Sequence, residues 1–204
     1  MTITTVEKSR EKGMMRIFID NRYGFTIPQD DYIRNHLYEE EEITEEKLLH
    51  IRQNVLVHAA RDRAVRYLII KDRSEGELIK KLTDSGFDAD VAKSAAEALK
   101  SIGYLNDNRY AMKYLAERIR TKALSKKALC FELEQKGISH EIIEEAFSEF
   151  ETDDEEIALR AARKKFGKYD LNDQKVERKV LSFLIHRGFS FEVGKKVLNC
   201  MKDN

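Results

Sequence analysis

The sequence predicts an all-α protein of three tandem three-helix repeats in an elongated, curved array, with a small N-terminal extension made of a β-hairpin and a helix. Composition is the first observation: charged residues make up 36% and apolar residues 42% of the 204 residues, with nine glycines and one proline, as in helix-rich proteins. The second is an apolar and glycine pattern that returns every 51 residues. Because three helices of this length bury little surface alone, neighbouring repeats are expected to stack.

The first expected element is a hairpin, within an extension that covers residues 1–58. In RIFIDNRYGFTI, residues 16–27, apolar and polar residues alternate on both sides of an Asp-Asn turn, and TITTVEK is a candidate third strand. Helices are expected to begin at Pro28 and at Thr44. The acidic run Glu39–Glu42 between them reads as a solvated connection, or else as a competitor of an anionic partner for basic surfaces.

The repeat is defined by five positions that recur three times. They are Leu78, Leu129 and Val180; Leu82, Leu133 and Leu184; Gly86, Gly137 and Gly188; Phe87, Ile138 and Phe189; and Val91, Ile142 and Val193. The first two positions lie four apart and therefore share one helix face, which predicts that they are buried. The glycine follows four residues later and can adopt the left-handed conformation that ends a helix.

Helix starts are predicted from N-cap residues. The last helix of each repeat follows a residue that can accept a hydrogen bond from exposed amides: Asp88, Ser139 and Ser190. For the middle helix, Ser74 and Glu77 form a capping box in the first repeat, and Ser125 takes the place of Ser74 in the second. The third repeat has no serine there, so its middle helix is expected to begin at Asn172 or Asp173.

A further helix is expected upstream of each pair. These stretches lie near residues 61–72, 108–122 and 154–168. The chain is therefore divided into the extension and three repeats, at residues 1–58, 59–105, 106–152 and 153–204.

The charges are balanced overall but unevenly distributed. Lys and Arg against Asp and Glu number 8 against 11 in residues 1–60, 17 against 12 in 61–136, 0 against 9 in 137–156 and 12 against 5 in 157–204. Two basic segments therefore flank an acidic one. This pattern fits either charge complementarity between neighbouring helices or a basic surface for a polyanion.

The sequence carries no signature of catalysis. It has no phosphate-binding glycine loop, no HExxH and no GxSxG, so no enzymatic activity, cofactor or metal site is predicted. Cys130 and Cys200 stand alone and read as reduced thiols. No apolar run approaches the roughly 18 residues of a membrane span, and the N-terminus lacks the apolar core of a signal peptide. A cytoplasmic monomer is expected.

The candidate binding residues are basic side chains of the second and third repeats. In the second they share a helix face or crowd the following turn: Arg109, Lys113, Arg118, Arg120, Lys122, Lys126 and Lys127. In the third they cluster at helical spacing: Arg160, Arg163, Lys164, Lys175, Arg178 and Lys179. The four cations at the turn of the second repeat are expected to leave unpaired charge. The alternative is a solvated face neutralised by residues such as Glu117 and Glu156. Tyr110 and Tyr114 could stack bases but are more typical of a core.

Three stretches, RSEGELIKKL, SIGYLNDNRYAMKYLAERI and ALSKKALCFELEQKGIS, resemble the RecX family of bacterial regulators of the RecA recombinase. The resemblance runs from about residue 60 to 200 and is most specific at Gly103–Ala111. It implies tandem three-helix repeats, binding along the groove of the RecA filament on single-stranded DNA, and modulation of recombination and the SOS response, with inhibition the expected sign. It implies no enzyme.

One departure concerns TKALSKKAL, residues 121–129, where the family commonly has arginines and this chain has lysines. Lysine preserves attraction to phosphate but not bidentate contacts. Two other functions remain open. A helical adaptor would bind only protein partners, and a DNA-binding regulator would use residues 74–99 as a helix-turn-helix. The latter is weak, because DADVAKSAAEAL offers no Arg, Asn or Gln at the start of a recognition helix.

Overall fold

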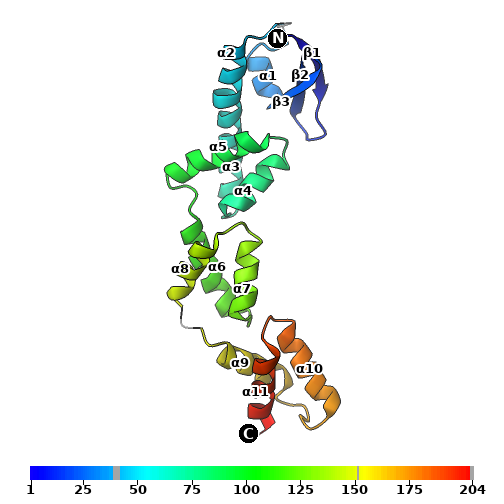
Figure 1. Cartoon of the computed structure of the whole chain (residues 1–204), viewed down its shortest axis with the longest axis vertical. Coiled ribbons are helices and arrows are strands. Elements are labelled where there is room, and N and C mark those ends of the chain that lie inside the picture. Colours follow the sequence, from blue (N-terminus) through cyan, green and yellow to red (C-terminus); the bar gives the residue numbers. More distant parts are fainter. Residues whose placement is uncertain (39–41, 151, 203–204) are drawn as a thin grey trace. The chain divides into compact units, whose positions relative to one another are not determined.

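A computed structural model describes residues 1–38, 42–150 and 152–202 of the chain (Figure 1). It contains two compact units, Met1–Asn106 and Asp107–Asn204. The first holds an N-terminal sheet and one three-helix repeat, and the second holds two more repeats. Most of the predicted acidic run, residues 39–41, lies outside the described residues. The predicted class, three-helix repeats behind a small extension, is confirmed.

The extension forms a three-stranded antiparallel sheet in the order β1-β2-β3. Its strands are β1 (Ile3–Lys8), β2 (Met14–Ile19) and β3 (Arg22–Pro28). The β2–β3 turn places Asp20 and Asn21 at φ of 48° and 62°, in the left-handed region that Asp and Asn tolerate better than most residues. The predicted hairpin and third strand are therefore both present.

The helices of the first unit follow the sheet in chain order: α1 (Gln29–Arg34), α2 (Glu45–His50), the π-helical η1 (Ile51–Leu56), α3 (Val57–Ile70), α4 (Glu75–Thr83) and α5 (Ala89–Ser101). The Thr44 hydroxyl accepts from the Lys47 amide at the start of α2, as predicted. The first helix of this repeat was expected near residue 61, but α2, η1 and α3 run on without a break. The stretch 45–70 contains no Gly or Pro to end it.

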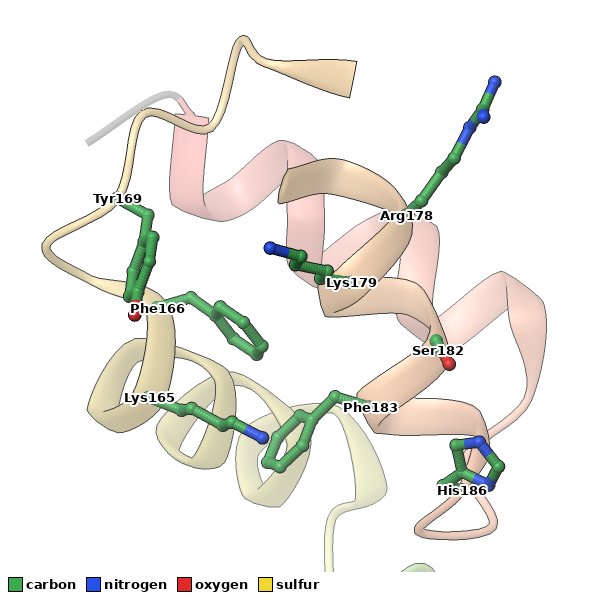
Figure 2. Close-up of a pocket in the computed structure, with 8 residues that line it drawn as sticks. All are labelled: Lys165, Phe166, Tyr169, Arg178, Lys179, Ser182, Phe183 and His186. Atoms are coloured by element: carbon green, nitrogen blue, oxygen red, sulfur yellow. The ribbon is translucent and has the colours of Figure 1, made fainter. Parts of the chain in front are cut away.

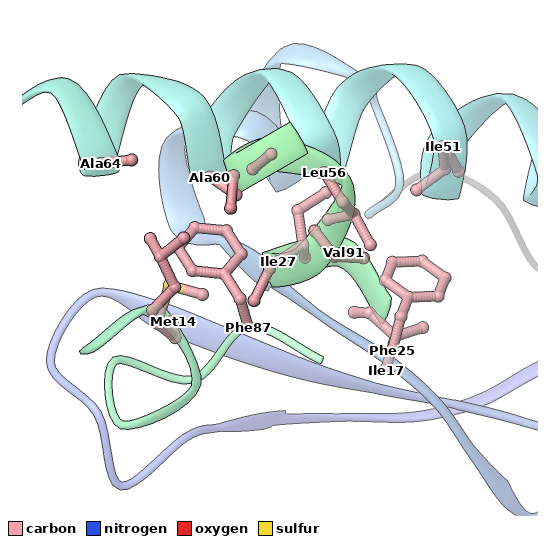
Figure 3. Close-up of a cluster of buried hydrophobic side chains, with 14 of the residues drawn as sticks. Met14, Ile17, Phe25, Ile27, Ile51, Leu56, Ala60, Ala64, Phe87 and Val91 are labelled. Atoms are coloured by element: carbon pink, nitrogen blue, oxygen red, sulfur yellow. The ribbon is translucent and has the colours of Figure 1, made fainter. Parts of the chain in front are cut away.

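One apolar core joins the sheet to the first repeat (Figure 3). Met14, Ile17, Phe25 and Ile27 face the helical stretch 51–64, and Phe87 and Val91 complete the cluster. The extension is therefore packed as part of the first unit, and its removal would expose the core of the repeat to water.

Asp88 differs from its predicted role as an N-cap. It stands at the N-cap position of α5, but its side chain makes no capping hydrogen bond. Instead its Oδ1 accepts from the Tyr23 hydroxyl at 2.5 Å, which joins β3 to the α4–α5 turn. The N-cap position of α5 was therefore predicted correctly. The Asp88 carboxylate binds the hydroxyl of Tyr23, 65 residues away, instead of the exposed amides of α5.

The second unit contains two repeats with separate cores. Its helices are α6 (Asp107–Thr121), α7 (Lys126–Glu134), α8 (His140–Ser148), α9 (Asp154–Phe166), α10 (Gln174–Ile185) and α11 (Phe191–Lys202). Ser125 caps α7, Ser139 caps α8 and Ser190 accepts from the Val193 amide at the start of α11. Asp173 caps α10, at one of the two predicted residues.

The 51-residue register holds in most of its positions. The two leucine-type positions and the aromatic or Ile position are buried in all three repeats, and Gly86, Gly137 and Gly188 have φ of 98°, 79° and 86°. The fifth position is buried only at Val91, whereas Ile142 and Val193 are half-buried. In the later repeats Ile143 and Gly194, one residue further on, are the buried ones. In the first repeat both Val91 and the following Ala92 are buried, so the buried stripe of the last helix is wider there.

The two repeats of the second unit meet at the α10–α11 turn. The Ser125 amide donates to the Arg187 carbonyl at 3.1 Å, and the Arg187 guanidinium donates to the Ala123 carbonyl at 3.0 Å. A Cβ on Gly188 would lie 2.6 Å from that of Ala128. The turn therefore fits closely over the N-terminus of α7 and satisfies backbone groups there.

Candidate polyanion interface

Arg118 of the second repeat is engaged within its own repeat. Its Nη2 donates to the Tyr114 hydroxyl at 2.8 Å, and its Nε lies 3.0 Å from Glu132 Oε2. The guanidinium also stands 4.9 Å from the centre of the Tyr114 ring. Burial and the hydrogen bond to Glu132 raise the pKa of Tyr114. Arg118 therefore holds α6 against α7, and its charge is largely offset by Glu132.

Lys126 is also paired. Its Nζ lies 3.1 Å from Glu144 Oε2 and 5.1 Å from the centre of the Phe147 ring. The expectation that all four cations at this turn carry unpaired charge is therefore wrong for Arg118 and Lys126. Lys122 and Lys127 are exposed, and within the described residues neither has a recorded side-chain partner.

The two tyrosines of the second repeat belong to its packed interior. Tyr110 is buried, and its ring stacks on Tyr114 with centroids 6.1 Å apart. The Lys136 ammonium stands 5.9 Å and 5.2 Å from the two ring centres. These contacts occupy the ring faces that a base would need, so the core interpretation holds.

A basic hollow lies where α6 ends beside α9 and α10, and we call it the junction hollow. Its volume is about 790 Å³, and six cations line it: Arg120, Lys122, Arg160, Lys164, Lys165 and Arg187. Among the described residues no Asp or Glu lines it. Four of the six were predicted as binding residues, and the fold brings them together from two repeats.

A second hollow of about 670 Å³, the aromatic hollow, adjoins the first. Lys165 and Phe183 line both. Figure 2 shows Tyr169 and Phe166 on one side and α10 on the other, with the Lys179 side chain extending toward Tyr169 and Arg178 pointing outward. Tyr169 is 57% exposed. Here too no carboxylate appears among the described lining residues.

The remaining predicted residues line neither hollow. Arg109 and Lys113 are exposed on α6, and each already takes part in an interaction. Arg163 lies 4.0 Å from the Cys200 sulfur, and Lys127 and Lys175 stand near the starts of α7 and α10. The structure thus divides the thirteen predicted cations into a group gathered around two hollows and a group distributed elsewhere.

Sequence reasoning missed Lys165 and Arg187. Both contact the Phe183 ring, Lys165 Nζ at 4.3 Å and Arg187 Cζ at 4.4 Å from its centre. A signal did exist for Arg187. It precedes Gly188 just as Lys136 precedes Gly137, and both of these cations stand over aromatic rings of their own repeats.

The arrangement can attract and hold an extended anion. Cations gathered in one hollow repel one another and raise the local positive potential, so binding of an anion relieves that repulsion. The described residues hold no group of three or more His, Cys, Asp or Glu side chains placed to bind a metal ion. None of the described helices is long and apolar enough to cross a membrane.

Family models, curated relatives and solved structures all indicate the same family. Family models for the first, second and third three-helix domains of RecX match residues 60–99, 106–146 and 153–198. The regulatory protein RecX of Clostridioides difficile is 30% identical over 200 residues, which cover 97% of this chain and 94% of the relative. That of Streptococcus sanguinis is 30% identical over 197 residues, covering 96% of this chain and 75% of the relative.

Solved structures show the same likeness. A crystal structure of regulatory protein RecX superposes with a TM-score of 0.63 at 25% identity and covers 100% of this chain and 99% of its own. The structure of RecX from Lactobacillus salivarius has a TM-score of 0.61 at 22% identity, with 73% and 98% covered, and supports the fold. The protein described here, with its three repeats matched in order, therefore belongs to the RecX family of regulatory proteins.

Proposed function

We propose that this protein regulates the RecA recombinase, without catalysis of its own, by binding the RecA filament on single-stranded DNA and lowering its activity in recombination and the SOS response. Family membership supports a regulatory role, because the relatives are named regulatory protein RecX. The observation that carries the proposal is the junction hollow, which gathers six cations and no described carboxylate on a chain with no net charge.

A nucleoprotein filament presents phosphates and acidic side chains in a regular groove, and cations on neighbouring helices suit such a target. Contact through phosphates and carboxylates carries no base readout, so the protein is expected to act on filaments of any sequence. The helix-turn-helix alternative has less support, because the Asp88 carboxylate at the start of α5 is held by Tyr23 and would repel a DNA backbone.

The test is the DNA-dependent ATPase of RecA. Purified protein is titrated into RecA assembled on circular single-stranded DNA, and the rate of ATP hydrolysis is expected to fall as the protein binds. An unchanged rate at a concentration equal to that of RecA, from protein with an intact helical circular dichroism spectrum, would count against the proposal.

A binding comparison separates filament regulation from the adaptor alternative. Affinity is measured for the RecA filament, for RecA without DNA and for single-stranded DNA alone. Regulation of the filament requires the first to exceed both others, whereas an adaptor that recognises only protein would bind RecA equally well with and without DNA.

A further inference from the structure

We propose that the second unit holds a strand-binding track for single-stranded nucleic acid, in which the junction hollow takes successive phosphates and the aromatic hollow takes a base against Tyr169. This deepens and rests on the function proposed above, because it assigns the DNA contact to named residues, mostly of the third repeat. The sequence pattern offered seven candidate cations in the second repeat and six in the third.

Two of the cations that would bind phosphate in the junction hollow, Arg187 and Lys165, are held in place before a ligand arrives. Arg187 is fixed by its hydrogen bond to the Ala123 carbonyl and by the Phe183 ring, and the same ring holds Lys165. Arg160 and Lys164 lie on α9 and are exposed, with no recorded side-chain partner in the described parts of the chain. Little side-chain ordering is then required of Arg187 and Lys165 when phosphate binds.

The track is longer than one nucleotide. Lys165 and Phe183 line both hollows, so the cationic lining continues from the end of α6 across α9 to Arg178 and Lys179 on α10. Eight Lys and Arg side chains are distributed along it: Arg120, Lys122, Arg160, Lys164, Lys165, Arg178, Lys179 and Arg187. A chain of phosphates matches this distribution better than a single phosphate group would.

The proposed stacking site for a base is the ring of Tyr169 in the aromatic hollow. Its ring is exposed, its edge-to-face contact with Phe166 at 5.9 Å fixes its orientation, and Lys179 extends toward it (Figure 2). Bases stack on such rings only when they are unpaired, which selects a single strand over a duplex. Ser182 and the exposed His186 add polar groups at the α10 side of the same hollow.

The second repeat lacks this arrangement at equivalent positions. Lys165, Tyr169 and Phe183 correspond at the 51-residue offset to Tyr114, Arg118 and Glu132. In the second repeat these three side chains bond to one another, and Glu132 supplies negative charge. Because Phe183 stands where the second repeat has Glu132, the third repeat lacks that neutralising carboxylate.

The experiment measures binding of a fluorescein-labelled oligo(dT) of about 20 nucleotides by fluorescence anisotropy as salt is raised, without RecA. The variant Arg160→Gln/Lys164→Gln should bind more weakly, and its slope of log affinity against log salt should be smaller by about 1.4, since each phosphate contact contributes about 0.7. The control Lys127→Gln/Lys195→Gln removes the same charge outside both hollows and should keep most of the parent's affinity.

The base site is tested with Tyr169→Ala, which should weaken single-strand binding about fivefold or more without changing the salt slope, while Tyr169→Phe keeps the parent's affinity. On a duplex of equal length Tyr169→Ala should have no effect. An equal loss on duplex, or none on the single strand, overturns the base site.

Three other outcomes overturn the track as a whole. They are no binding by the parent at low salt, equal salt slopes for the hollow variant and its charge-matched control, and displacement of the oligonucleotide by an equal concentration of thymidine monophosphate, which would indicate a mononucleotide pocket. Because these measurements contain no RecA, failure here is distinct from failure of the proposed function, which is decided by the ATPase assay.

Discussion

Tyr23 illustrates how a single residue can connect two parts of the first unit. Burial and the hydrogen bond to Asp88 raise the pKa of Tyr23 to about 12, and burial raises the pKa of Asp88 as well. Both groups come from elements that the sequence predicted, β3 and the α4–α5 turn. Their contact could not be predicted, because hairpin and repeat patterns give no distance between elements far apart in the chain.

A raised tyrosine pKa gives a pH dependence of known sign. Tyr23 stabilises the fold fully below its unfolded pKa near 10, and this contribution is lost as pH rises toward about 12. The stability advantage of the parent over Tyr23→Phe should therefore shrink between pH 9 and pH 12, measured by urea unfolding. In an absorbance titration Asp88→Asn should lower the pKa of Tyr23. An unchanged titration would show that the Asp88 bond has no influence.

At the scale of an element, α7 shows what periodicity predicts well. Leu133 is fully buried and Phe131, two residues before it, is 60% exposed. Leu133→Ala should lower the free energy of unfolding by about 2–5 kcal/mol, as for other buried aliphatic truncations. Phe131→Ala on the same helix should change it by less than about 0.5 kcal/mol. Chemical denaturation of both variants checks the register, and similar losses from the two would contradict it.

Glycine turns provide a second test at this scale, because two of them share a left-handed φ but differ in surroundings. Around Gly103, at φ 76°, a Cβ would meet nothing within 4 Å, whereas at Gly188 it would meet Ala128 and Ser125 at 2.6 Å. Gly103→Ala should cost about 1–2 kcal/mol from backbone strain alone. Gly188→Ala should cost clearly more and lower the melting temperature further. Equal losses would mean that the turn does not pack closely on α7.

Other features of the elements lie beyond sequence patterns. The run from α2 through η1 to α3 was expected as two separate helices, because the acidic start and the repeat pattern each indicated a boundary. The absence of Gly and Pro from residues 45–70 was the available signal of continuity. Within the π-helical η1, Arg52 donates to the Gly24 carbonyl of β3, and no sequence pattern predicts such a contact between elements 28 residues apart.

For the whole molecule, the repeat pattern predicted the fold because each repeat uses the same local rules: an apolar pair, a left-handed glycine and an N-cap. The candidate site was predicted only in part. Sequence spacing showed which cations share a helix, and so selected Arg160 and Lys164. It could not show that Glu132 and Glu144 neutralise Arg118 and Lys126, since those pairs join different helices.

One residue of the α10–α11 turn takes part both in the contact between the two repeats of the second unit and in the lining of the junction hollow. The Arg187 guanidinium donates to the Ala123 carbonyl before α7 and also lines the junction hollow, so docking of one repeat on the other and formation of the proposed binding surface depend on the same side chain. The two equilibria are thermodynamically linked: any ligand that fills the hollow also favours the docked arrangement, and any change that separates the repeats lowers affinity without touching the ligand.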